Sequence, residues 1–278
     1  MKKLFLTSLL AVFAASGAQA ANVIDGNPLY MPRAGHFYSV TDLSSHTHVA
    51  NTADTVTLGE EFGYGISDKL GINLKTSFVE REGFDDYAWQ DLALKATFRA
   101  FADGNVVADV YGAYAAGPIV PLGGGLVAHS KVADDTFWFD KDLINYTWTA
   151  GVRMGYTTGA LTLAGHFEYD YINTESFNWN EEGAGWTNHA MKFGLDGQYV
   201  IDQSWNLVAG AEYKGYLDDE ADNSGTWTGY FGVNYNIDAT KFVGAYINGS
   251  MNHQGGTGAD EWEFDDGFGF GMKFGIDF

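Results

Sequence analysis

The sequence contains no cysteine, only four prolines and few basic residues. Without cysteine there is no disulfide framework, no zinc–thiolate site and no catalytic thiol. Lysine and arginine number 15 against 36 aspartates and glutamates, and the formal net charge is −21. So acidic a chain is not expected to bind nucleic acid, because the phosphate backbone requires a basic face. Long apolar runs are also missing after the first 20 residues, so the rest of the chain offers no candidate for a membrane-spanning helix.

The first 20 residues carry the features of an export signal. Lys2 and Lys3 precede an apolar segment at 4–15, and Ala18-Gln19-Ala20 is typical of a cleavage site. The apolar segment is shorter than the roughly 20 residues that a membrane-spanning helix needs. We therefore expect residues 1–20 to be a signal peptide that is removed on export.

The C-terminal sequence alternates between large apolar residues and small or polar ones. In DDGFGFGMKFGIDF, every second residue from Phe268 to Phe278 is apolar, and most of the others are glycine. Successive side chains of a strand point to opposite faces, so one face is suited to hydrocarbon and the other to water. About twelve segments alternate in this way, most with roughly the 9–11 residues of a membrane-crossing strand: 35–43, 55–66, 70–78, 91–101, 105–115, 146–156, 161–171, 190–199, 205–216, 227–236, 241–250 and 267–278.

Two kinds of connection separate these segments, and they alternate along the chain. The short ones are rich in Asp, Gly and Asn, as expected of tight turns, and lie at 67–69, 102–105, 157–160, 201–204 and 237–241. The long ones are polar and irregular, and lie at 44–54, 80–88, 117–145, 172–189, 217–226 and 251–266. Short turns at one end of a barrel and long loops at the other are typical of bacterial outer-membrane barrels.

With its signal peptide and its terminal Phe278, the chain resembles the Gram-negative outer-membrane β-barrels. The resemblance implies an all-β fold, a transmembrane antiparallel up-and-down barrel of about 12 strands. It also implies that Phe274, Ile276 and Phe278 form the signal read by the barrel-assembly machinery. Residues 21–33 would be a periplasmic N-terminal segment, and residues 34–278 the barrel. The expected partners are outer-membrane lipid, lipopolysaccharide, the assembly machinery and small solutes.

Charged residues at alternate positions of these strands must avoid lipid, where each would cost about 2–4 kcal/mol near the midplane. We therefore expect the following side chains to line the lumen, with a basic strip opposite an acidic one: Lys75, Asp91, Lys95, Arg99, Asp109, Arg153, His166, Glu168, Asp170, Lys192, Asp196, Glu212, Lys214 and Lys273. Their charges nearly balance, so the acidic excess belongs to the long loops. Those loops provide either a solvated rim or one that gathers divalent cations. Glycines recur at inward positions such as Gly151 and Gly271, which should leave space.

Two segments do not fit the simple pattern. In 55–66, turning Leu58 and Phe62 toward lipid also turns Glu60 outward, which requires either a β-bulge or a position near the interface. The connection at 117–145 is apolar and glycine-rich, unlike the other loops. It would either fold into the lumen or cover the barrel mouth.

The function expected of such a barrel is a passive, porin-like channel for small hydrophilic solutes. The alternatives are a structural or adhesive surface barrel with a lumen closed by ion pairs, and a barrel enzyme of the lipase or protease type. His129-Ser130 lacks the spacing of a lipase pair, and His46 and His48 lack a third metal ligand. His166 beside Glu168 and Asp170 is more typical of salt bridges than of catalysis. We therefore expect no enzyme activity, no metal site and no cofactor.

Overall fold

The computed structural model describes residues 27–47, 55–81, 86–118, 143–176, 186–217, 225–253 and 262–278. These residues form one closed antiparallel barrel. Its strands are Phe37–Thr47 (β1), Thr55–Ser67 (β2), Leu70–Arg81 (β3), Asp86–Asp103 (β4), Val106–Pro118 (β5), Leu143–Thr158 (β6), Leu161–Ser176 (β7), Trp186–Val200 (β8), Trp205–Tyr216 (β9), Gly225–Asn236 (β10), Lys241–His253 (β11) and Trp262–Asp277 (β12). The predicted fold class and strand count are confirmed. Among the described residues, no helix is long and apolar enough to cross a membrane.

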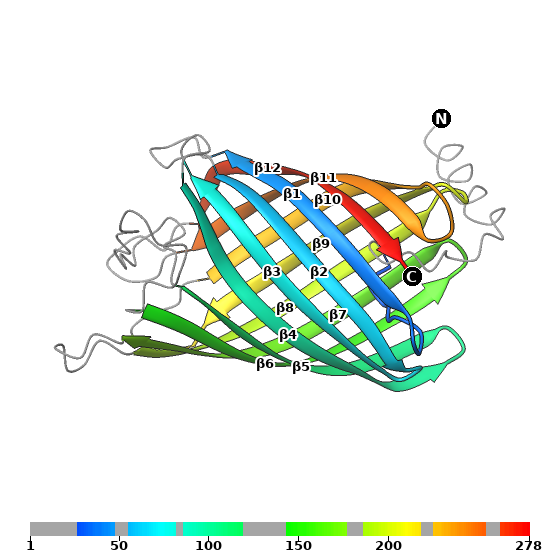
Figure 1. The fold of residues 1–278 in the computed structure, drawn as a ribbon, viewed down its shortest axis with the longest axis horizontal. Helices are drawn as coiled ribbons and strands as arrows, with labels where there is room; N and C mark the ends of the chain where they lie inside the picture. Colours follow the sequence, from blue (N-terminus) through cyan, green and yellow to red (C-terminus); the bar gives the residue numbers. More distant parts are fainter. Residues whose placement is uncertain are drawn as a thin grey trace.

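The barrel closes between its first and last strands, which lie side by side in Figure 1. Every other strand pairs with its neighbours in sequence, so each connection is a simple hairpin. The short turns lie together at the end of the barrel that also holds the C-terminus (Figure 1). Closure leaves no free sheet edge, which is a requirement for a β-structure inside a membrane.

The strands are longer than the sequence pattern predicted, mainly at their loop ends. β4 begins at Asp86 and β12 at Trp262, each five residues before the predicted start. Alternation is required only where one face meets hydrocarbon. Where both faces meet water, the strand can continue without it. The signal peptide, the acidic loop centres and residues 119–142 lie outside the described residues.

The outer face of the described wall is largely apolar. Trp148, Met154 and Leu195 are each more than half exposed, and so are Phe231 and Phe268. Soluble monomers rarely expose so large an apolar area, and a membrane would cover it. The assignment of the apolar side of each strand to the outside is therefore correct.

Inward-facing glycines lie beneath large side chains from the neighbouring strand. A Cβ at Gly151 would come within 2.4 Å of the Tyr111 ring, and one at Gly271 within 2.2 Å of the Tyr246 ring. The expectation that these glycines leave open space is wrong, because aromatic rings lie flat over them. This packing stiffens the wall and moves the tyrosine hydroxyls toward the charged residues of the lumen.

Residues 27–33 lie inside the turn end of the barrel. The segment begins with a turn in which the Tyr30 amide donates to the Asn27 carbonyl, and Ala34 then bridges to Gly65 of β2. Leu29 is only 5% exposed. The last part of the expected periplasmic segment therefore runs along the inner wall, and the residues before position 27 lie outside the described part.

Candidate functional site

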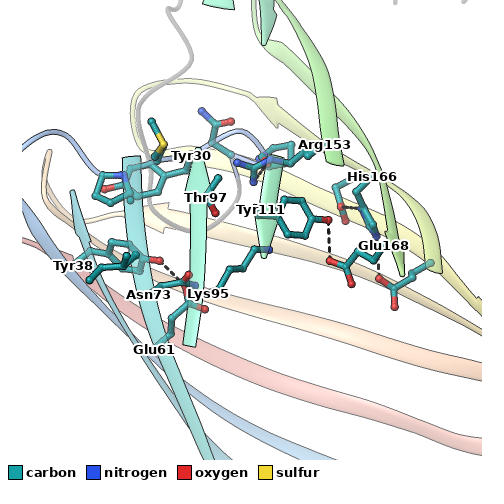
Figure 2. Close-up of a pocket in the computed structure, with 18 of the residues that line it drawn as sticks. Tyr30, Tyr38, Glu61, Asn73, Lys95, Thr97, Tyr111, Arg153, His166 and Glu168 are labelled. Carbon is teal, nitrogen blue, oxygen red and sulfur yellow. Dashed lines mark hydrogen bonds and ion pairs between the residues drawn. The ribbon is translucent and has the colours of Figure 1, made fainter. Parts of the chain in front are cut away.

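The lumen contains a polar cavity of about 390 Å³. Figure 2 shows charged and tyrosine side chains converging on it from both sides. Asn27, Pro28 and residues 30–32 form part of its lining, and strand residues form the rest. Those that line the cavity and take part in the interactions described below are Tyr38, Glu61, Asn73, Lys95, Tyr111, Arg153, His166, Glu168, Asp196, Glu212 and Tyr230.

The turn side of the cavity is built around a buried carboxylate. The side chain of Asp109 is fully buried and accepts from the Nε atoms of Arg99, at 2.9 Å, and Arg153, at 3.1 Å. The same two guanidinium groups donate to the backbone carbonyls of residues 27–33. Arg99 bonds Leu29 at 2.7 Å and Arg153 bonds Pro28 at 2.6 Å. The arginines therefore join three strands of the wall to the N-terminal segment.

A second group of charges lies on β7 and β8. The Lys192 ammonium is 3.0 Å from a carboxylate oxygen of Glu168 and 3.0 Å from one of Asp170. The Tyr111 hydroxyl donates to Glu168 at 2.8 Å, and Thr149 donates to Asp170 at 2.6 Å. Both carboxylates therefore have two partners. Asp170 is buried, while Glu168 lines the cavity.

His166 lies between two more carboxylates. Its Nε2 is 2.9 Å from Glu212 and its Nδ1 is 3.3 Å from Asp196. An ionised carboxylate can only accept hydrogen bonds, so a ring between two of them satisfies both when each ring nitrogen carries a proton. The Tyr230 hydroxyl also donates to Asp196, at 2.9 Å. His166 is thus an ion-pair centre of the wall, but its partners are Asp196 of β8 and Glu212 of β9 and not Glu168 and Asp170, the residues beside it in the sequence.

Lys95 differs from the other cations of the cavity. Its ammonium lies 3.8 Å from the centroid of the Tyr111 ring. No carboxylate of a described residue lies within ion-pair distance of it, whereas Arg153 and His166 are both paired. Figure 2 shows the side chain reaching under the ring toward the cavity. Lys95 is therefore available to a passing anion or dipole.

The remaining predicted lumen residues are more scattered. Lys75 is exposed opposite Glu61 in the register, although Glu61 accepts instead from Tyr38 and Asn73. Lys214 lies 4.9 Å from the ring of Tyr216. A separate pair lies on β12 and β1, where Lys273 is 3.9 Å from Asp42. The side chain of Asp91 lies outside the described residues.

Acids and bases therefore alternate around the described wall, rather than forming two opposed strips. Asp109 is directly opposite Arg153 in the β5–β6 register, and Glu168 is directly opposite Lys192 in the β7–β8 register. Cross-strand pairing of opposite charges favours this mixing. The sequence pattern did not indicate the inward tyrosines or the inner N-terminal segment. The sequence did contain a signal for the tyrosines. Tyrosine occurs at inward positions of strands whose neighbours carry inward glycines, and this pairing could have predicted that the rings pack over the glycines.

The described residues contain no further arrangement with recognisable chemistry. No group of three His, Asp or Glu side chains among them could hold a metal ion. The side chains of His46, His48, His129 and Ser130 lie outside the described residues. His166 has carboxylates on both nitrogens, and no hydroxyl nucleophile of a described residue pairs with it.

Comparison with known proteins extends to the fold only. No protein-family model matches the chain, and no curated protein matches its sequence. The COG4313 outer membrane channel from Pseudomonas putida F1 is similar in structure, with a TM-score of 0.57 and 14% identity. That match covers 92% of this chain and 99% of the channel. The NanC porin has a TM-score of 0.53 and 9% identity, over 85% of this chain and 98% of its own. The chain is a twelve-stranded β-barrel of the outer-membrane type.

Proposed function

We propose that the protein is a passive, porin-like channel for small hydrophilic solutes in the Gram-negative outer membrane. The observation that carries this proposal is the polar cavity of about 390 Å³ inside a wall whose outer face is apolar. An apolar outside and a polar inside are what a water-filled passage through a membrane requires. The two similar structures described above are a channel and a porin, which agrees with this function.

The lining supports a weakly selective passage. Most of its carboxylates already accept hydrogen bonds from the wall, so a solute meets a surface whose charges are largely paired. The tyrosine hydroxyls and the Asn73 amide can exchange hydrogen bonds with a sugar-sized or amino-acid-sized solute. Lys95 adds one positive charge with no carboxylate partner among the described residues. Such a lining admits polar molecules without binding them so tightly that they stop.

A second candidate is a structural or adhesive surface barrel that conducts nothing. Residues 27–33 favour it, because they occupy the turn end of the lumen and are held there by Arg99 and Arg153. In this case the ion pairs would close the barrel rather than line a path. The two candidates differ in a single measurable property, which is ion conductance.

We also propose that the barrel is not an enzyme of the lipase or protease type. Both nitrogens of His166 are engaged by carboxylates, so neither is left to take a proton from a nucleophile. The variants His166→Ala and Ser130→Ala should leave any background lipase or protease activity of the purified protein unchanged. Loss of such an activity in either variant would support an enzyme instead.

The proposed cellular setting follows from the same reasoning. The chain would be exported by its signal peptide, inserted by the barrel-assembly machinery and surrounded by lipid and lipopolysaccharide. Small solutes would be its only ligands, with no cofactor and no nucleic acid.

Single-channel recording in planar lipid bilayers tests the proposed function. The mature protein, purified and refolded without its first 20 residues, should give discrete conductance steps in KCl. Vesicles containing it should swell when small sugars are added outside, and should respond less as the sugar becomes larger. Complete absence of steps at all voltages, with folding confirmed by circular dichroism, would reject the channel and favour the closed barrel.

A further inference from the structure

Glu60 and Glu61 are consecutive in β2, so their side chains point to opposite faces of the wall. The β1–β2 ladder is regular past both residues, and the register shift of the β2–β3 ladder comes only after Gly65. The bulge considered above as a way to turn Glu60 away from lipid is therefore absent. Glu60 stays on the outer face, where Ser39 and Thr41 donate to its two oxygens at 2.5 and 2.6 Å. Glu61 points inward and lines the cavity.

Only one of the two carboxylate oxygens of Glu61 is engaged by the wall. Its Oε1 accepts from the Tyr38 hydroxyl at 2.5 Å and from the Asn73 amide at 2.9 Å. Among the described residues, none donates to Oε2 and no cation lies within ion-pair distance of this carboxylate. Lys75 is directly opposite in the β2–β3 register, but its side chain is exposed and does not pair with Glu61. Glu61 therefore gives the cavity lining an unengaged acceptor oxygen and an unmatched negative charge.

Lys95 lines the same cavity with the opposite charge. Asn73, which donates to Glu61, is directly opposite Lys95 in the β3–β4 register. One strand separates β2 from β4, so the backbones that carry the two charges are about 10 Å apart. The charged groups are close enough to attract each other, but they do not form an ion pair. Tyr38 and Asn73 hold Glu61 on one side. The Tyr111 ring holds the Lys95 ammonium on the other (Figure 2).

The other charges around the cavity are paired, and they nearly cancel among the described residues. The arginine cluster at Asp109 has a net charge of +1. Lys192 with its two carboxylates has a net charge of −1, and so has a protonated His166 with its two. A solute with a net charge of either sign therefore gains little from the lining as a whole. A solute that carries one charge of each sign can gain at both Lys95 and Glu61.

We infer that the cavity binds small zwitterions of amino-acid size, with the solute carboxylate on Lys95 and the solute ammonium on Glu61. The inference rests on the proposed channel function and names the class of solute that the channel favours. An α-amino acid carries its ammonium and its carboxylate on the same carbon. With a hydrogen bond of about 2.8 Å at each end, it can bridge two partners that are too far apart to pair directly. The solute breaks no ion pair of the wall when it binds, because Lys95 and Glu61 have no charged partner of their own among the described residues.

Swelling of lipid vesicles that contain the protein tests the preference, with L-glutamine and L-arabinose as the probes. The two molecules are close in mass and have no net charge, but only glutamine is a zwitterion. After subtraction of the rates in protein-free vesicles, glutamine should enter about three times faster, a modest ratio because partly hydrated ion pairs are weak. Entry of arabinose establishes a channel, so equal rates for the two solutes would overturn the inference and leave the proposed function standing. Entry of neither solute, with folding confirmed by circular dichroism, would reject both.

Two variants test whether these two charges are responsible. Lys95→Met and Glu61→Gln should each make the rates of glutamine and arabinose entry nearly equal, while arabinose still enters. The matched control is Lys214→Met, which removes a lumen lysine outside the cavity lining and should keep the wild-type ratio. In a KCl gradient, the reversal potential should shift toward cation selectivity for Lys95→Met and toward anion selectivity for Glu61→Gln. A loss of packing alone would not produce these opposite shifts. A wild-type ratio in both variants, or an equal loss in Lys214→Met, would mean that the inference is wrong.

Discussion

Asp109 lies directly opposite Arg153 across the β5–β6 ladder, with its carboxylate completely buried. Arg99 binds the same carboxylate from β4. The side chains of Arg99, Asp109 and Arg153 therefore form one cluster in the wall, with a net charge of +1. The arginines also extend to the carbonyls of Pro28 and Leu29, so this point fixes the position of the N-terminal segment as well.

Removing the carboxylate from this cluster should strongly destabilise the barrel. Asp109→Ala leaves two partly buried guanidinium groups without their anion, and breaking a buried ion pair in this way costs about 3–5 kcal/mol. Urea unfolding of the refolded protein in detergent, followed by tryptophan fluorescence, should show the loss. The matched control is Lys75→Ala, because the Lys75 side chain is exposed in the same lumen. This variant should change the free energy of unfolding by less than about 0.5 kcal/mol. Equal effects of the two variants would contradict the central role of Asp109.

Freeing the N-terminal segment should widen the conducting path. Leu29 is buried against the wall at Gly155, so Leu29→Asp should make the docked position unfavourable. The expected result is a larger unitary conductance in planar bilayers, with the barrel still folded. The matched control is Arg33→Ser, because the Arg33 side chain is exposed in the same segment. An unchanged conductance for Leu29→Asp would show that the segment does not limit the flow of ions.

Filling the space under an inward tyrosine should also destabilise the wall. A Cβ at Gly151 would overlap the ring of Tyr111, which lies in a fixed place because its hydroxyl binds Glu168. Gly151→Ala should therefore lower the free energy of unfolding by about 1–3 kcal/mol, the usual range for overpacking. Gly229→Ala is the control, because its nearest neighbour would be at an ordinary 3.7 Å. If both variants have the same urea midpoint of unfolding as the wild type, the Tyr111 ring is free to move aside, and the prediction is wrong.

The sequence was sufficient to predict the faces and number of the strands. The alternation from Phe268 to Phe278 recurs in the other strands, with Glu60 of β2 as an exception, because one side must meet hydrocarbon. This constraint acts on each strand alone. Partner choice in the lumen could not be predicted in the same way. Whether Lys192 meets Glu168 depends on the stagger between strands, which the closure of the whole barrel determines.

The position of residues 27–33 inside the barrel could not be predicted from the sequence either. These residues have no periodic pattern, and their partners are far away in sequence. Arg99 is 70 positions from Leu29, and Arg153 is 125 positions from Pro28. Only the folded barrel brings these guanidinium groups together. Glu60 is the opposite case, since the sequence correctly marked it as an exception to the alternation.

The turn between β10 and β11 should respond to acid. The backbone amide and the hydroxyl of Thr240, together with Lys241, lower the pKa of Asp238 to about 2. A carboxyl with a lowered pKa in the folded state stabilises the fold above its unfolded pKa of about 3.9, and the stabilisation is lost as the pH falls toward 2. Asp238→Asn should therefore flatten the dependence of the urea midpoint on pH between 4 and 2. An identical profile would mean that the turn interactions are absent in solution.

Phe278 should matter for assembly much more than for stability. Its ring is 66% exposed, while its backbone pairs with Phe37 in both directions and completes the seam between β12 and β1. Phe278→Ala keeps these backbone bonds and removes little buried area, so the free energy of unfolding should change by less than about 1 kcal/mol. If the terminal ring is read by the assembly machinery, the amount of barrel in the outer membrane of expressing cells should nevertheless fall severalfold. Phe37→Ala removes an exposed ring from the other side of the same seam and should leave that amount near wild type. A matching loss in both variants would attribute the effect to the seam itself and not to recognition of the terminal residue.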